Sequence, residues 1–281
     1  GIPKERLTLI GDNDSPIPWH TLLTGMIFIQ MFYWGTNQVI TQRAMAAPNI
    51  KEAQKGVLAA AGIRLLIVPA IIVIPGIVSF KLYGDIGDAA YGTIVFDLLP
   101  TWLSGAFAAA MAAAVLTTYN SNLNSATALY VCDIHEAYFN AKPNVPILSG
   151  VVTILITILS LFLVQVYAQA ESIINLIQQL YGLLSMPILS VFILGLVFKN
   201  VDPKVGIFSV VFGVILYASL TFETSPLYAQ QQLHFIHLMF ITLLTCISLA
   251  LMLNWLFYKQ PPQISLEAFR EEQQNKASNV N

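Results

Sequence analysis

Long apolar stretches separated by short polar loops dominate the chain. Seven of them are long enough to cross a bilayer as helices, near residues 19–41, 54–82, 104–139, 145–168, 171–198, 204–222 and 233–258. A shorter stretch, Ala89–Leu99, is bounded by Gly87 and Pro100. It is too short to span, so we expect a re-entrant or extracellular surface helix there. The pattern predicts about seven transmembrane helices and one short helix.

Composition supports a membrane environment. Hydrophobic residues make up 56% of the chain, charged residues make up only 10%, and the mean hydropathy is +0.69. A soluble domain usually has about 25% charged residues. We therefore predict an all-α integral membrane protein whose partner is the lipid bilayer. The net charge is −2 and no basic block is present in the sequence, so we expect no nucleic-acid partner.

The chain reads as one transmembrane domain, residues 1–258, followed by a polar tail, residues 259–281. Its start, Gly1-Ile2-Pro3-Lys4, has no initiator Met and resembles a loop. We therefore expect the C-terminal part of a larger protein. The tail combines Pro261-Pro262 with mixed charge, Gln and Asn, which is typical of a solvated, partly helical or disordered end.

Positive charges predict the orientation of the segments. One set of helix ends carries the positive residues Arg43, Lys51, Lys55, Lys142, Lys199, Lys204 and Lys259. The opposite set, between segments, carries Lys81 alone, together with Asp85, Asp88, Glu171 and Glu223. Cytoplasmic loops carry the excess of Lys and Arg in membrane proteins. The C-terminus is therefore expected in the cytoplasm, with the bundle in the cell (plasma) membrane.

A run of hydroxyl and amide residues lies inside the third segment, at Thr117–Ser125. Ala114, Thr117 and Thr118 are spaced i, i+3, i+4, which places them on one helical face. Polar groups at this depth are costly unless they meet partners, and uncharged oxygens suit a hard cation such as sodium. Alternatively, each hydroxyl bonds to a carbonyl one turn earlier while the neighbouring alanines let helices pack closely.

The first segment contains a predicted weak point at Gly35, surrounded by polar and aromatic residues that include Gln30, Tyr33 and Asn37. Interrupted helices at the bilayer midplane expose backbone groups that bind ions and substrates. Aromatic faces stack on apolar sugar faces, and amides satisfy sugar hydroxyls. The alternative is a belt of aromatic residues at the membrane interface.

Two further segments contain candidate polar residues. Arg64 lies inside the second segment, where an arginine either has a function, meets a polar partner or reaches back to the interface. Pro69 and Pro75 should kink that helix. In the fifth segment Gln178, Gly182 and Ser185 share one face, and Gly182 with Pro187 predicts a second break. Gln178 could bind a polyhydroxylated ligand or fix a contact between helices.

No catalytic constellation stands out. The sequence shows no Ser/His/Asp arrangement, glycine-rich phosphate loop or pair of carboxylates at membrane depth. We therefore expect a protein that is not an enzyme and that uses no organic cofactor.

Several separated motifs resemble the solute:sodium symporter family, and within it the sodium/sugar cotransporters. They are, in order, Tyr33-Trp34-Gly35-Thr36-Asn37-Gln38-Val39-Ile40-Thr41-Gln42-Arg43, Ala46-Ala47, Glu52-Ala53-Gln54-Lys55-Gly56, Val73-Ile74-Pro75-Gly76, Phe107-Ala108-Ala109, Leu123-Asn124-Ser125, Asp133-Ile134, Tyr181-Gly182-Leu183 and Leu194-Gly195-Leu196. The resemblance runs from Pro16 to about Lys204. It implies the leucine-transporter type of inverted-repeat helical bundle, with the second repeat and two further helices in this chain and the first repeat outside it.

The resemblance also implies roles for individual residues. The sodium site is similar to the Ala114 carbonyl with the Thr117 and Thr118 hydroxyls. Tyr33 resembles the aromatic gate below the sugar, and Gln178 resembles a sugar-binding glutamine. Two positions depart from the family pattern, since Gln30 replaces an asparagine and Arg64 replaces a lysine, both of which contact sugar. Asn37 completes the expected substrate-binding set.

The implied function is sodium-coupled symport of a small polar solute, most simply a sugar, by alternating access. Sodium would be the co-transported ion and the sugar-like solute the other small-molecule partner. Arg64 leaves open an anionic solute or an amino acid on the same fold. A membrane sensor that binds solute without transporting it is a further alternative.

Overall fold

The computed structural model describes residues 17–169, 173–222, 233–259 and 263–264, and residues 3, 7, 10–13 and 15 near the start of the chain. The chain forms two compact units. The first unit is built mainly from Asn37–Ile173, and the second from Ile10–Thr36 together with the chain from Ile174 onward. The chain passes from the second unit to the first at Thr36–Asn37.

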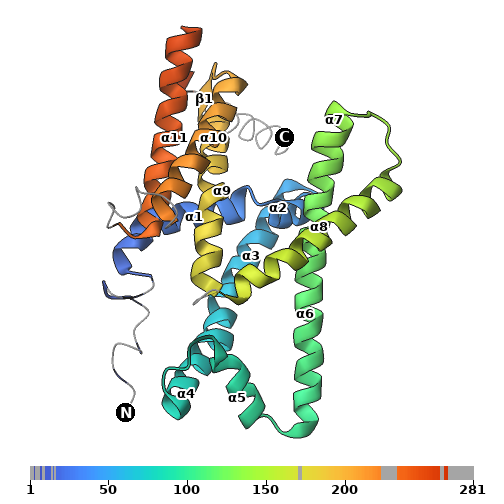
Figure 1. Ribbon diagram of the computed structural model, residues 1–281, viewed down its shortest axis with the longest axis vertical. Coiled ribbons are helices and arrows are strands. Elements are labelled where there is room, and N and C mark those ends of the chain that lie inside the picture. The colour runs from blue at the N-terminus through green and yellow to red at the C-terminus, as the bar shows by residue number, and fades with distance from the viewer. Residues whose placement is uncertain are drawn as a thin grey trace, which may run out of the picture. The chain divides into compact units, whose positions relative to one another are not determined.

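The first unit is helical throughout its described elements (Figure 1). Two of its long helices continue through π-helical turns, so α3 runs into α4 and α6 runs into α7. In chain order the elements are α2 (Gln38–Met45), α3 (Ile50–Val68), η3 (π-helical, Pro69–Val73), α4 (Ile74–Tyr83), η4 (3₁₀, Gly87–Ala89), α5 (Ala90–Leu98), α6 (Thr101–Ala128), η5 (π-helical, Leu129–His135), α7 (Glu136–Tyr138) and α8 (Val145–Ala168).

The second unit packs helices from both ends of the chain together. In Figure 1, α10 and α11 run side by side. The elements of this unit are η2 (3₁₀, Trp19–Leu23), α1 (Gly25–Gly35), α9 (Ile173–Val197), β1 (Phe198–Lys199), α10 (Pro203–Thr221), α11 (Phe235–Tyr258) and β2 (Gln263–Ile264). The strands β1 and β2 pair antiparallel, with Phe198 opposite Ile264 and Lys199 opposite Gln263.

Within the described residues, six helices are long and apolar enough to cross a membrane: Ile50–Tyr83, Thr101–Tyr138, Val145–Gln165, Ile173–Val197, Pro203–Thr221 and Phe235–Tyr258. They correspond to six of the seven predicted segments, and the short helix predicted at Ala89–Leu99 is α5. The remaining segment, 19–41, is divided into η2, α1 and α2. The all-α integral membrane architecture is therefore confirmed. The inverted-repeat topology stays a prediction.

The core of the second unit is formed by side chains from α1, α9, α10 and α11. Its buried members are Ile29, Met186, Leu189, Tyr217, Leu238, Met239 and Leu243. Small residues allow the close approach: a Cβ added at Gly25 would lie 2.8 Å from Ile236 Cγ2 and would also overlap the Ile236 carbonyl. Such overlap with backbone cannot be relieved by a side-chain rotation, so α1 packs directly against the start of α11.

Polar side chains join η2 to α11 in the same unit. The His20 and His237 rings stack with their centroids 4.8 Å apart, and His20 Nδ1 lies 2.7 Å from His237 Nε2. The other nitrogen of His237 lies 2.9 Å from the Thr24 hydroxyl. Because both ring nitrogens of His237 meet partners, this pair fixes the chain entering α1 against α11.

The proline predictions have different outcomes. At Pro69 the helix becomes π-helical for five residues, as expected where a residue has no N–H to donate one turn back. Pro75 follows in the first turn of α4, directly after these π-helical turns. The break predicted at Gly182 and Pro187 is wrong, since α9 is continuous from Ile173 to Val197 with Pro187 inside it. The buried packing around Pro187 supports the helix there.

The predicted solvated tail is described at only a few positions. Gln263 and Ile264 are exposed and form β2, so this part of the tail is a strand and not helix or coil. Residues 260–262 and 265–281 lie outside the described residues.

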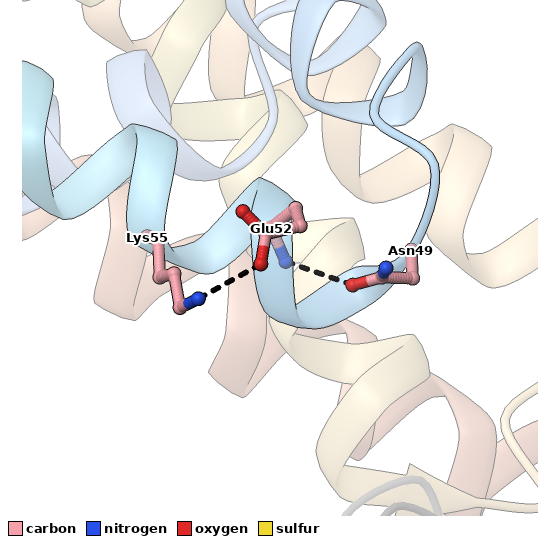
Figure 2. Close-up of polar contacts among 3 residues, drawn as sticks. All are labelled: Asn49, Glu52 and Lys55. Atoms are coloured by element: carbon pink, nitrogen blue, oxygen red, sulfur yellow. Dashed lines mark hydrogen bonds and ion pairs between the residues drawn. The ribbon is translucent and has the colours of Figure 1, made fainter.

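The start of α3 is fixed by a side-chain cap (Figure 2). The Asn49 side-chain oxygen accepts a hydrogen bond from the Glu52 backbone N–H at 2.9 Å. The Glu52 carboxylate in turn lies 2.8 Å from Lys55 Nζ, one turn further along. Asn49 satisfies one of the N–H groups that the first helical turn leaves unpaired, and the acidic residue there complements the helix dipole.

Replacing Asn49 with alanine is expected to lower the free energy of unfolding by about 1 kcal/mol, because the cap is lost and one N–H group depends on water alone. The measurement is reversible unfolding of the purified protein in mixed micelles. Lys55→Ala is the matched control, and it should cost less than about 0.5 kcal/mol because its ion pair is exposed. Equal losses in the two variants would contradict the capping role of Asn49.

Candidate functional site

The predicted interruption of the first segment is present. The helix α1 ends at Gly35, and the Thr36 backbone N–H and hydroxyl both donate to the Phe32 carbonyl at 3.0 Å. Asn37 is extended, with φ −72° and ψ 118°, and α2 begins at Gln38. Glycine at the last position of α1 weakens the helix, and the hydroxyl of Thr36 offers its last turn another donor. The interruption thus leaves helix ends whose backbone groups can bind ligands.

Asn37 has a structural role at this interruption. Its side-chain oxygen accepts from the Val39 N–H at 3.0 Å and so caps α2. Its backbone carbonyl also accepts from the Thr41 hydroxyl at 3.1 Å. The amide oxygen is therefore occupied within the helix, and any solute contact made by Asn37 must use its NH₂ group.

Gln30 and Tyr33 are both on α1, one turn apart, but they differ in exposure. Gln30 is exposed and lines a shallow depression on the helix with Trp34, one turn later. Tyr33 is half-buried and meets the Trp34 ring edge-on at a centroid distance of 5.7 Å. Tyr33 also interacts electrostatically with Tyr181 of α9. The structure therefore places Tyr33 against the helix that carries Gln178.

Gln178 carries a polar atom that the described residues leave unsatisfied. Its side-chain oxygen is buried and has no hydrogen-bond partner among them. One turn later, the Tyr217 hydroxyl packs against Gly182, where an added Cβ would also lie 2.7 Å from Met239 Cε. A buried acceptor without a partner costs about 1–3 kcal/mol unless a ligand or water supplies one. Gln178 is therefore suited to receive a donor from outside the protein.

Arg64 lies on α3 within the Ile50–Tyr83 span, and its side chain is exposed. Its neighbours Leu65 and Leu66 are 77% and 78% exposed, so this part of the helix presents an apolar surface interrupted by one guanidinium. An arginine surrounded by such residues in a membrane span requires a partner or a route to water.

Ala114, Thr117 and Thr118 lie together on α6 and are exposed, so the described part of the chain does not enclose them. The Thr117 hydroxyl donates to the Ala113 carbonyl at 2.7 Å, as the alternative reading of this run expected. This bond uses the hydroxyl proton and leaves oxygen lone pairs for a cation. The Thr118 hydroxyl makes no hydrogen bond to a described residue, whereas the Thr118 carbonyl accepts from Asn122 Nδ2 at 2.9 Å.

Sequence reasoning did not identify the contacts that hold α2 against α6. Arg43 Nη2 donates to the Ser121 hydroxyl at 2.6 Å, and Gln42 Nε2 donates to the Ser125 hydroxyl at 2.8 Å. Ser121 and Ser125 follow Thr117 at intervals of four residues, so all three share one face of α6. That spacing was the available signal, but it does not show which helix lies opposite.

A pocket between α6–η5 and α8, lined by both polar and apolar side chains, was also not predicted. It has a volume of about 370 Å³ and is lined in part by Asn120, Asn124 and Ser149. Beside it the hydroxyls of Thr127 and Thr153 are 3.2 Å apart, which links the two helices. Asn120 and Asn124 thus face α8, while Ser121 and Ser125 face α2.

Comparison with known proteins identifies the relatives of this chain. The model of the sodium:solute symporter family matches residues 12–213. The chain belongs to the sodium:solute symporter family. This finding confirms the resemblance carried by the motifs around Tyr33, Leu123 and Tyr181. It also confirms the expectation of a protein that is not an enzyme, since the family and the relatives described below are named as symporters or cotransporters.

Three curated members of the sodium:solute symporter family illustrate the range of similarity. The "Uncharacterized symporter YidK" of Escherichia coli (strain K12) is 31% identical over 258 residues, which cover 90% of this chain and 44% of that protein. The "Sodium/myo-inositol cotransporter 2" of Bos taurus is 32% identical over 77% of this chain and 36% of its own length. The "Sodium/glucose cotransporter" of Vibrio parahaemolyticus is 32% identical over 72% of this chain and 42% of its own length. The chain therefore spans less than half the length of these symporters.

Proposed function

We propose that this chain forms part of a sodium-coupled symporter that carries a small polyhydroxylated solute by alternating access. The observation that carries the proposal is the interruption at Thr36–Asn37, in a segment flanked by Gln30, Tyr33 and Asn37. Interrupted helices of this kind mark binding sites in secondary transporters. Family membership and the names of the relatives support sodium as the coupling ion.

The sodium ligands in this proposal are the Ala114 carbonyl and the hydroxyl oxygens of Thr117 and Thr118. All three come from one turn of α6, so a single ion can contact them together. Oxygen ligands without charge favour a monovalent hard cation over divalent ions, which usually recruit carboxylates. Within the described residues no cluster of three or more His, Cys, Asp or Glu side chains offers such a divalent site.

The solute contacts in this proposal are Gln30, Tyr33, Asn37, Arg64 and Gln178. Glucose and myo-inositol, named in two relatives, are rings that carry a hydroxyl on most carbons. An aromatic face such as that of Tyr33 suits the C–H face of such a ring. The unpartnered oxygen of Gln178 and the NH₂ group of Asn37 suit its hydroxyls.

Energy coupling follows from linked binding. If sodium and solute both favour the same conformation, each raises the affinity for the other by the same factor. Moving one sodium ion down the membrane potential contributes about 2.3 kcal/mol per 100 mV. The orientation proposed from the positive charges places the C-terminus in the cytoplasm and the protein in the plasma membrane. Solute would then move inward with sodium.

The test is initial uptake into proteoliposomes that contain the complete gene product. Labelled glucose, galactose and myo-inositol are compared with an inward sodium gradient and with potassium replacing sodium. Sodium-dependent uptake of at least one of them is the expected result. Uptake that is equal in sodium and potassium would overturn sodium coupling. Sodium-dependent binding without uptake would support a solute sensor instead.

A second candidate keeps the fold and changes the solute. Arg64 places a fixed positive charge inside an apolar span, and its planar fork of donors matches a carboxylate. An anionic solute or an amino acid carries a carboxylate that this guanidinium could bind. Competition separates the candidates: excess carboxylates that block sodium-dependent uptake, while sugars and inositols do not, would assign the anionic solute.

A further inference from the structure

Two side chains in the last turn of α2 fasten this helix to the proposed sodium helix α6. Arg43 donates from Nη2 to the Ser121 hydroxyl at 2.6 Å and from Nη1 to the Val39 carbonyl of its own helix at 3.0 Å. Gln42 donates to the Ser125 hydroxyl at 2.8 Å. Both helices belong to the first compact unit, so these contacts lie within one body.

The hydrogen bonds continue along α6 toward the proposed sodium ligands. Ser125 donates to the Ser121 carbonyl at 2.8 Å, and Ser121 donates to the Thr117 carbonyl at 2.8 Å. Ser121 therefore accepts a hydrogen bond from a charged guanidinium and donates its own to the Thr117 carbonyl. A hydroxyl that accepts a bond from a cation becomes a stronger donor, because bonds in a chain polarise one another. The Thr117 backbone is thus sensitive to the position of α2.

The other end of α2 carries a proposed solute residue. Asn37 caps the helix through the bond from Val39 N–H, and Arg43 donates to the carbonyl of that same Val39. A shift of α2 along α6 would therefore move Asn37 and change the hydrogen bond on Thr117 together. The chain leaves the second unit at this point, which makes α2 the first rigid element after the interruption.

We propose that Arg43 and Gln42 are positioning residues that couple sodium binding on α6 to the interrupted helix. The inference rests on the proposed function, because it assigns Thr117 and Thr118 to sodium and Asn37 to solute. Arg43 acts through Ser121 and touches neither ligand itself. Sodium binding favours the arrangement in which Arg43 is bonded to Ser121, and that arrangement holds Asn37 at the interruption.

The experiment is equilibrium binding of radioactive sodium to the complete protein in detergent, for wild type, Arg43→Lys, Ser121→Ala and the double variant. Lysine keeps the charge but cannot donate to Ser121 and Val39 in the same planar geometry. Each single variant is expected to raise the sodium concentration for half saturation about five- to tenfold. The double variant should bind sodium about as weakly as the single variant with the larger loss, since both changes remove the same contact between Arg43 and Ser121.

Further variants test the geometry. Gln42→Ala removes a contact between neutral groups, so its expected effect is smaller, about two- to threefold. Lys51→Ala is the matched control, because Lys51 is an exposed cation near the start of α3. The sodium affinity of this variant should equal that of the wild type. If Arg43→Lys does not fold, the single change Ser121→Ala, at a half-buried position of α6, still decides the matter.

The possible outcomes distinguish failure of the proposed function from failure of this inference alone. No sodium binding by the folded wild-type protein would overturn the proposed function and this inference with it. Sodium binding by the wild type that is unchanged in Arg43→Lys and Ser121→Ala would overturn the inference alone. Multiplicative effects in the double variant would also overturn it, because two independent losses would then be acting.

Discussion

Replacement of Thr118 by alanine in the complete protein is expected to raise the sodium concentration for half-maximal uptake at least tenfold, with the solute affinity at saturating sodium changed by less than about twofold. The Thr118 hydroxyl makes no hydrogen bond to a described residue, so the change removes a proposed ion ligand and breaks no contact seen within them. A tenfold change corresponds to about 1.4 kcal/mol, which is modest for one ion ligand. Sodium titrations of initial uptake provide the measurement.

Two control variants define what the Thr118 result means. Thr118→Ser keeps the oxygen and should keep sodium affinity within about threefold of the wild type. Ser219→Ala removes a hydroxyl of α10 that only bonds back to the Ile215 carbonyl at 2.7 Å, and it should have no effect on sodium affinity. Unchanged sodium dependence in Thr118→Ala would remove α6 from the sodium site.

Replacement of Gln178 by alanine is expected to weaken the apparent solute affinity about ten- to hundredfold at saturating sodium. The Gln178 side-chain oxygen is buried without a partner among the described residues. A site built to hydrogen-bond a solute hydroxyl loses much of its affinity when that bond cannot form. Sodium binding measured without solute should stay within about twofold of the wild type, because Gln178 and the proposed sodium ligands belong to different units. Competitive uptake with unlabelled solute provides the apparent affinity.

The adjacent glutamine supplies the matched control for Gln178. Gln179 has the same side chain but lies about 100° further around α9, away from the face shared by Gln178 and Gly182. Gln179→Ala is therefore expected to keep the solute affinity of the wild type. If both alanine variants lose uptake equally, the effect reports on α9 as a whole and contradicts a specific role for Gln178.

The helical architecture could be predicted from the sequence because its signals are local. A bilayer requires long apolar stretches, so the limits of α8, α10 and α11 follow from composition within a few residues. The interruption after α1 was also predictable, since Gly35 lies among polar residues in an otherwise apolar segment. At Pro69 the missing N–H predicted the disturbance that appears as a π-helical turn.

The failures come from tertiary packing. Gly182 and Pro187 predicted a helix break as Gly35 did. Gly182 instead accommodates the Tyr217 hydroxyl, and both residues are buried, so packing maintains α9 as one helix. The sequence did not show that the Asn37 side-chain oxygen caps α2, and the solute-binding role of Asn37 stays a prediction. The pairing of Arg43 with Ser121 depends on which helix faces α6, and spacing along one helix cannot show that.

The most direct test of the account is accumulation of solute against its own gradient. Proteoliposomes with the complete protein start with equal concentrations of labelled solute inside and outside, using whichever of glucose, galactose or myo-inositol shows sodium-dependent uptake. An inward sodium gradient is then imposed. Coupled symport predicts that internal solute rises above the external concentration and returns to it when an ionophore dissipates the sodium gradient. Internal solute that never exceeds the external concentration in any of the three cases would contradict sodium-coupled symport of a polyhydroxylated solute.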